Sequence, residues 1–221
     1  MRQIPDARLD ETIPDLLHRL RNPLAALKSG VSLVMHVAKP TGETLDLLNQ
    51  MLNEIGRLDL VTRETQRYFC MTAGRPQSVR VAQVASEARD AAQDEATRAG
   101  VEIVLEGGGE ESALVDHGQL HFSLTELLTN ACRESAPGGR VRVVWRPGRE
   151  GFVAIDVVDS GKGIPSTQAD EIGKPYFSTS PGRTGLGLAT VAKVCRLAGG
   201  SLSWNNLGAR GCRFTAELPI G

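Results

Sequence analysis

Apolar residues recur at alternating spacings of three and four along the first helix that the sequence predicts. This is the pattern of a helix whose apolar seam packs against another helix. The segment Lys39–Gly42 contains Pro40 and cannot continue the helix, and a second amphipathic run begins near Glu43. Two long helices joined by a short turn predict an antiparallel hairpin. The seam of the first helix consists of Leu17, Leu20, Leu24, Leu27, Val31 and Val34.

One hairpin cannot bury the whole of such a seam within a single chain. Pairing of two hairpins into a four-helix bundle is the simplest way to cover it. We therefore expect a homodimer through residues from about 9 to 70. The first predicted domain is 1–73, and it ends at a linker, Ala73–Pro76, that contains both glycine and proline.

From residue 78 to residue 221 the pattern changes to alternating helices and strands, which predicts a second domain of the α/β class. The segment Ser160–Thr184 is rich in glycine and proline and is predicted to be a long loop. Predicted helices are Val81–Arg98, His117–Glu134 and Leu186–Ala198, and predicted strands are 101–105, 141–145, 153–157, 201–204 and 212–218.

Composition excludes several classes of protein. The 25 Lys and Arg residues balance 26 Asp and Glu residues, and the net charge of −1 argues against a nucleic-acid-binding protein. No apolar run is long enough for a membrane span, and the first twenty residues do not have the pattern of a signal peptide. The four cysteines lack the spacing of a zinc site. We therefore expect a cytoplasmic protein.

His18 directly follows the seam residue Leu17, so it is predicted to face solvent beside the seam. Asn22 lies four residues later on the same helix face. A single exposed histidine is usually an ordinary surface residue. However, Pro23 stands inside the helical pattern, where it removes a hydrogen bond and bends or loosens the helix at a cost of about 3 kcal/mol. This cost indicates that the turn around His18 has a function.

Three further segments have the residue types of a nucleotide site. Glu126 and Asn130 are spaced i, i+4 on one predicted helix and offer hard oxygen ligands for Mg²⁺, although a solvated helix face would look the same. Asp159 ends a predicted buried strand and is followed by Gly161 and Gly163. A carboxylate there can accept a hydrogen bond from a base amine, although an ordinary turn has similar residues.

The third segment, Arg183–Leu188, lies at the N-terminus of a predicted helix, and its glycines can expose backbone N–H groups to phosphate. Alone it is a weak signal. The sequence contains neither a P-loop nor a good dinucleotide-binding fingerprint.

Taken in order, five segments resemble the conserved boxes of two-component sensor histidine kinases, most closely those of the nitrogen-regulation type. Together they span most of the chain, and five motifs in the family's order are a specific match. The segments that resemble the H-box, N-box, first glycine box, F-box and second glycine box are His18–Leu24, Glu126–Ala131, Asp159–Pro165, Lys174–Ser180 and Thr184–Ala189.

The resemblance implies the fold: a helical hairpin, forming a four-helix bundle in the dimer, followed by an α/β sandwich of the gyrase, heat-shock chaperone and MutL type. It implies ATP and Mg²⁺ as cofactors and His18, Asn22 and Glu126 as catalytic residues. Asp159 would contact the adenine amine and Asn130 would hold Mg²⁺. The nucleotide-binding residues implied are Asn130, Arg133, Asp159, Gly161, Gly163, Lys174, Thr184, Gly185, Leu186 and Gly187.

The resemblance also implies that the imidazole of His18 takes the γ-phosphoryl group and passes it to an aspartate of a response regulator. The chain shows no sensing domain. We therefore expect the signal to come from a separate sensor protein or from a sensor domain trimmed from this sequence.

The chain departs from the family at three positions. Arg19 stands where the family usually has the acid that takes the imidazole proton, although Asp15 lies three residues before His18. Arg133 replaces a common phosphate-binding lysine, and Glu126 replaces a frequent asparagine. Three hypotheses follow: an active autokinase, a dimer with a weak ATP site that transfers or removes phosphate on a partner, and a plain ATPase in which His18 is incidental.

Overall fold

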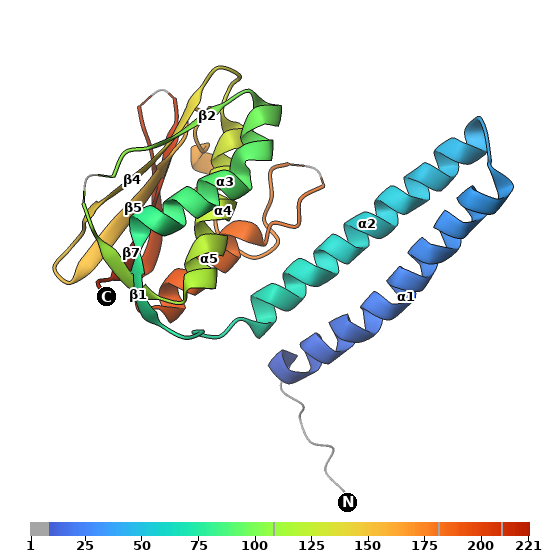
Figure 1. The fold of residues 1–221 in the computed structure, drawn as a ribbon, viewed down its shortest axis with the longest axis horizontal. Coiled ribbons are helices and arrows are strands. Elements are labelled where there is room, and N and C mark those ends of the chain that lie inside the picture. Colours follow the sequence, from blue (N-terminus) through green and yellow to red (C-terminus); the bar gives the residue numbers. More distant parts are fainter. Residues whose placement is uncertain (1–8, 108, 181, 209) are drawn as a thin grey trace, which may run out of the picture. The chain divides into compact units, whose positions relative to one another are not determined.

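The computed structural model describes residues 9–107, 109–180, 182–208 and 210–221. Its chain falls into two compact units. The hairpin unit comprises the described residues up to Cys70 together with Ser178–Leu186, and the α/β unit comprises Met71–Phe177 and Gly187–Gly221 (Figure 1). No helix of the described residues is both long and apolar enough to cross a membrane.

The predicted helical hairpin is confirmed, with α1 (Leu9–Ala38) and α2 (Glu43–Cys70) running antiparallel (Figure 1). The connecting turn has left-handed backbone at Lys39, φ 45°, and at Gly42, φ 58°. Helix α1 continues through Pro23 without interruption. The expected local loosening there does not break the helix.

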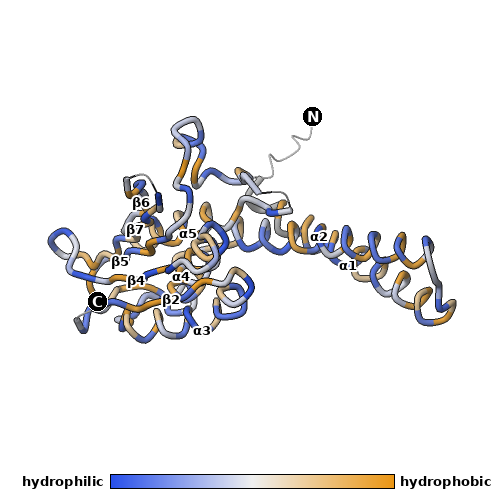
Figure 2. The backbone as a smooth tube through the Cα atoms, turned by 90° about the horizontal axis from the view of Figure 1, so that it is seen from above, coloured by the Kyte–Doolittle hydropathy of each residue, from blue (hydrophilic) through white to orange (hydrophobic). Residues whose placement is uncertain are grey.

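The apolar seam of α1 is divided between two surfaces. Leu17 and Val31 are buried, and Leu24 is half-buried. The other seam residues, Leu20, Leu27 and Val34, are exposed. Helix α2 repeats this division, because Ile55 is buried and other apolar residues are about half exposed. Hydrophobic segments accordingly recur along both helices (Figure 2). We call the exposed residues the outer stripe: Leu20, Leu27, Val34, Met51 and Leu58.

The α/β unit contains a five-stranded sheet covered on one face by three helices (Figure 1). The strand order is β2-β4-β5-β7-β6, and all neighbouring pairs are antiparallel except the parallel pair β2 and β4. This agrees with the predicted α/β class. The strands are β2 (Glu102–Leu105), β4 (Arg140–Pro147), β5 (Phe152–Val158), β6 (Ser201–Asn206) and β7 (Cys212–Pro219), and the helices are α3 (Val81–Ala99), α4 (His117–Glu134) and α5 (Gly187–Leu197).

Two short strands were not predicted. Strands β1 (Gln77–Arg80) and β3 (Ser112–Val115) pair antiparallel in a separate two-stranded sheet. Each has only four residues, so alternation of polar and apolar side chains gives little signal. A 3₁₀ turn, Ser166–Gln168, lies inside the segment predicted as a loop.

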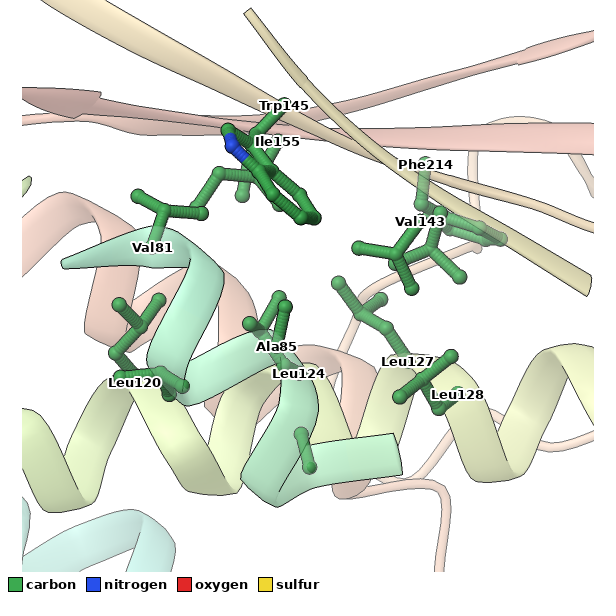
Figure 3. Close-up of a cluster of buried hydrophobic side chains, with 14 of the residues drawn as sticks. Val81, Ala85, Leu120, Leu124, Leu127, Leu128, Val143, Trp145, Ile155 and Phe214 are labelled. Carbon is green, nitrogen blue, oxygen red and sulfur yellow. The ribbon is translucent and has the colours of Figure 1, made fainter. Parts of the chain in front are cut away.

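The core of the α/β unit forms where the inner face of the sheet meets α3 and α4. Sheet residues such as Val143, Ile155 and Phe214 face the helices (Figure 3). Helix α4 contributes a stripe at helical spacing, namely Leu120, Leu124, Leu127 and Leu128, each at most 1% exposed. Burial of this stripe fixes the rotation of α4 about its own axis, and therefore the direction in which its polar face points.

Candidate functional site

Asp159 stands one residue after strand β5 and is buried, with 7% of its surface exposed. Its Oδ1 atom accepts hydrogen bonds from the backbone N–H of Gly161 at 2.8 Å and of Cys212 at 3.0 Å. Within the described part of the chain, Oδ2 accepts no hydrogen bond. Burial raises the pKa of Asp159, and the two backbone hydrogen bonds oppose that rise. The carboxylate is thus held in one orientation with one oxygen left for a ligand.

The glycine-rich loop after Asp159 is held by a residue at the end of the edge strand β6. Gly161 is required there, because a Cβ would lie 2.5 Å from the carbonyl oxygen of Glu134. The Asn206 side chain accepts from the Ile164 N–H at 2.9 Å and donates to the Ile164 carbonyl at 2.8 Å. Gly163 has φ 76°, so this loop needs glycine there as well.

Asn206 is a residue that the sequence reasoning missed. It ends strand β6, 42 residues after Ile164, and belongs to none of the recognised boxes. The only signal was that a carboxamide at a strand end can cap a neighbouring loop, which is too common to single out one asparagine.

Helix α4 places Glu126 and Asn130 on one face, both half-buried. A Cβ on Gly187 would lie 2.5 Å from Glu126 Oε2, so the carboxylate packs directly on the first residue of α5. The positive end of a helix dipole favours an anion at that place. The structure thus brings together two of the predicted site residues, Glu126 and Gly187. Oxygen donors from Glu126 and Asn130 are of the chemical type that Mg²⁺ prefers.

The two basic side chains predicted to bind the nucleotide, Arg133 and Lys174, are both engaged with acids. Arg133 donates from Nε and Nη2 to Glu95 of α3 at 2.7 and 3.0 Å. This hydrogen bond is the main cause that raises the pKa of Arg133. Lys174 Nζ lies 2.6 Å from Glu171 Oε1. Either side chain would have to exchange its carboxylate partner for a phosphate.

The segment before α5 makes a local turn. Gly185 has φ 71°, and Thr184 Oγ1 accepts a hydrogen bond from the Leu186 N–H at 3.2 Å. Leu186 is buried. A glycine in left-handed conformation lets the chain enter the helix that starts at Gly187.

His18 and Asn22 lie together on the hairpin, lining a groove of about 450 Å³ between α1 and α2. His18 is exposed, as predicted. Asp59 of α2 lines the same groove and pairs with Arg63 at 3.2 Å. The groove is completed by Arg21, Leu24, Ala25, Lys28 and Ile55.

Arg19, the residue after the histidine, forms an ion pair with Asp15. Arg19 Nε lies 3.0 Å from Asp15 Oδ2, and both side chains are mostly exposed, at 76% and 65%. An exposed pair of this kind is worth about 0–1 kcal/mol and exchanges readily. Even so, the acid nearest to His18 in sequence has a cation as its partner.

Thiol chemistry does not contribute at this site. Burial raises the pKa of Cys212, which lies beside Asp159, to about 12, and that of Cys195 also to about 12. Both thiols are therefore protonated at neutral pH.

Residues 115–221 match the family described as histidine kinase-, DNA gyrase B-, and HSP90-like ATPase. The sensor histidine kinase ZraS of Klebsiella oxytoca is 29% identical over 207 residues, which cover 92% of this chain and 44% of ZraS. The chain thus spans less than half the length of this curated relative.

Two solved structures have the same fold. Full-length ShkA in complex with AMPPNP superposes with a TM-score of 0.81 at 21% identity, covering 96% of this chain and 46% of ShkA. The histidine kinase ThkA in complex with the response regulator protein TrrA gives a TM-score of 0.68 at 22% identity, covering 96% of this chain and 61% of that chain.

The sheet, its covering helices and the family match define residues 115–221 as an ATPase domain of the histidine kinase, gyrase B and HSP90 class. With the helical hairpin before it, the chain is similar along 92% of its length to a sensor histidine kinase.

The raised pKa of Asp159 gives a prediction for stability. The folded value lies above the usual 3.8, so the contribution of Asp159 to stability is complete below the unfolded pKa and is lost as pH rises through the folded pKa. The Asp159→Asn protein has no such charge. We expect the free energy of unfolding of the Asp159→Asn protein, relative to that of the parent, to increase as pH rises from about 4 to about 7.

Urea titrations followed by tryptophan fluorescence measure this difference, because both tryptophans, Trp145 and Trp204, belong to the α/β unit. Asp90→Asn, an exposed acid on α3, is the control and should show no such trend. Parallel pH profiles for the Asp159→Asn and parent proteins would contradict the prediction.

Proposed function

We propose that this protein is an ATP-dependent histidine autokinase that phosphorylates His18 and passes the phosphoryl group to an aspartate of a response regulator. The observation that carries this proposal is an exposed histidine on a hairpin groove in the same chain as an ATPase domain whose strand-end carboxylate has a free oxygen. The names of the relatives and the partners in the solved complexes support the same assignment.

The free Oδ2 of Asp159 would accept a hydrogen bond from the exocyclic amine of adenine. The loop clamped by Asn206 would form the wall beside the base, with Gly161 and Gly163 permitting close approach. The phosphates would be contacted by Arg133 and Lys174 and by the segment Thr184, Gly185, Leu186 and Gly187 that leads into α5.

Asn130, with Glu126 one turn before it, would hold Mg²⁺, which when bound supplies positive charge against the phosphate oxygens. The two side chains share one face of α4, and that face is fixed by the buried leucines on the opposite side. The contribution of Glu126 and Asn130 is therefore to hold these oxygens in place, whereas the covalent chemistry would belong to His18.

In the transfer step, a neutral imidazole nitrogen of His18 attacks the γ-phosphorus in line. A P–N bond forms, the bond to the bridging oxygen breaks, ADP leaves with the bonding electrons, and the imidazole loses its N–H proton to a base. Asn22 lines the same groove, and its carboxamide would donate a hydrogen bond to the phosphoryl oxygens on His18.

The ion pair between Arg19 and Asp15 favours a second candidate, a phosphotransfer or phosphatase dimer with weak kinase activity. The family usually places an acid directly after the histidine, and here that position carries the cation that binds the nearest acid. Weak kinase activity of this kind would result if autophosphorylation were slow while the hairpin could still exchange phosphate with a response regulator.

The primary test uses γ-labelled ATP. We expect the parent protein to take up label that is released by acid and resists alkali, as a phosphohistidine does, and the His18→Gln protein to lose at least nine-tenths of it. His36→Gln is the matched control, because His36 also lies on α1. Equal labelling of the parent and the His18→Gln protein would refute the proposal.

Nucleotide binding gives a second test, which concerns the proposed ATP site and does not depend on His18. We expect Asp159→Asn to weaken ATP affinity about tenfold or more, because it places an amide donor opposite the amine of adenine. Asn130→Ala should remove the dependence of affinity on Mg²⁺. Calorimetric titrations with and without Mg²⁺ measure both effects, and parent-like affinity in both variants would contradict the proposed site.

Arg19, the residue after the histidine, gives a third test of the proposed function. Arg19→Glu supplies the missing acid and also frees Asp15, so we expect faster labelling of His18 at unchanged ATP affinity. General-base help is typically worth about 10²–10⁴-fold, which is the upper limit for the gain. If Arg19→Glu is neutral and Asp15→Asn slows labelling, the base is Asp15 despite its ion pair. Arg57→Glu on α2 is a charge-matched control.

The outer stripe supports a homodimer, because its leucine, valine and methionine side chains are about half exposed in one chain. We expect light scattering to give twice the mass of 23.7 kDa. Leu20→Glu together with Leu27→Glu should give the monomer, whereas Leu114→Glu on the α/β unit should not. A parent protein that stays monomeric as its concentration rises would contradict the dimer.

A further inference from the structure

The linker between α2 and β1 is attached to the start of α4. The side chain of Gln119 donates to the carbonyl of Thr72 at 2.7 Å. The backbone N–H of Arg75 donates to Asp116 Oδ2 at 3.1 Å. Both bonds join the linker to residues more than 40 positions later in the chain. We call Asp116, Gln119 and the linker residue Gly74 the linker clamp.

Gly74 lies inside this clamp in a conformation that other residues adopt poorly. Its φ is 66°, and a Cβ there would lie 2.7 Å from Asp116 Cβ and 2.8 Å from Gln119 Nε2. The linker therefore passes against the two side chains at a distance that only glycine permits.

The two oxygens of Asp116 have separate tasks. Oδ1 caps α4 by accepting from the Gln119 N–H at 3.1 Å, and Oδ2 accepts from the linker. The hydrogen bond from the Arg75 N–H is the main cause that lowers the pKa of Asp116. The carboxylate is thus charged throughout the neutral range, and a charged acceptor makes a stronger hydrogen bond than a neutral one.

The clamp shortens the tether that follows α2. Helix α2 ends at Cys70 and β1 begins at Gln77, so the linker is Met71–Pro76. Because Thr72 is already attached to α4, Met71 alone lies between the helix end and the first clamp bond. Each residue spans at most about 3.3–3.6 Å, so the tether is a few ångströms long, against roughly 20 Å for the released linker.

We propose that the linker clamp keeps the ATPase domain on a short tether and thereby speeds phosphorylation of His18. This inference rests on the proposed autokinase function. For two groups joined by a flexible chain, effective concentration falls roughly as the −3/2 power of its length once the chain can span the sites. The clamp residues are positioning residues: Asp116 lies about three turns before Glu126 on α4 and touches none of the proposed nucleotide contacts.

The test uses variants that open the clamp and leave α4 capped. Asp116→Asn keeps one side-chain oxygen for the cap but lacks the second acceptor for the Arg75 N–H, and Gln119→Leu removes the bond to Thr72. Gly74→Ala opens the clamp from the linker side by the added Cβ. Asp90→Asn is the control, since Asp90 is an exposed acid on α3 that touches no linker residue.

We expect Asp116→Asn combined with Gln119→Leu, and separately Gly74→Ala, to slow labelling of His18 at saturating ATP about five- to fifteenfold. This is the −3/2 power for one or two free residues becoming six. The affinity for ATP should not change. Hydrogen exchange at the Arg75 amide, read by NMR, should be slow in the parent and fast in both variants.

Two results would overturn the clamp. One is an Arg75 amide that exchanges freely in the parent protein, and the other is an unchanged or faster labelling rate in variants whose Arg75 amide has become exposed. A parent protein that protects Arg75 but never labels His18 would instead refute the autokinase function, and the role of the clamp in it.

Discussion

Burial of one face of α4 is the constraint on which the rest of the α/β unit depends. Its four leucines are at most 1% exposed, and each contributes about 1.5–3 kcal/mol by leaving water. A rotation of the helix by one residue would carry that stripe out of the core. The polar residues of α4 consequently have fixed directions: Asp116 meets the linker, Glu126 meets α5, and Arg133 meets α3.

Two buried acids near the end of β5 show why one of them is suited to bind a ligand. Asp156 is 3% exposed, but it accepts from Thr215 at 2.7 Å and has Arg146 at 3.3 Å, so its charge is compensated within the protein. Among the residues that the structure describes, Asp159 has only backbone donors, both on the same oxygen. A buried carboxylate without a cation is costly to keep charged. A ligand that donates a hydrogen bond to Oδ2 would offset part of that cost.

The sequence predicted the elements whose signals are local. The hairpin and the helices α3 and α4 follow from apolar spacing within each segment, and α4 was found at the predicted bounds, His117–Glu134. What was missed depends on contacts distant in sequence. Strand β1 pairs with β3 about 35 residues away. The guanidinium of Arg133 donates two hydrogen bonds to Glu95, 38 residues earlier, and no spacing rule indicates that partner. The seam was recognised, but only the packed hairpin shows which of its residues stay exposed.

The position of Glu126 bears on which phosphate species the start of α5 can accept. A helix start attracts anions through its free N–H groups and its dipole, and that attraction is worth about 0.3–1 kcal/mol. Here the Glu126 carboxylate already lies against Gly187, and its charge also helps to raise the pKa of Arg133. Bare phosphate would meet a like charge, whereas phosphate that arrives with a divalent cation turns the same carboxylate into an attractive group. If nucleotide binds at this helix start as proposed, we expect Glu126 to make that binding more dependent on Mg²⁺ than an asparagine would, because the cation must offset one further negative charge.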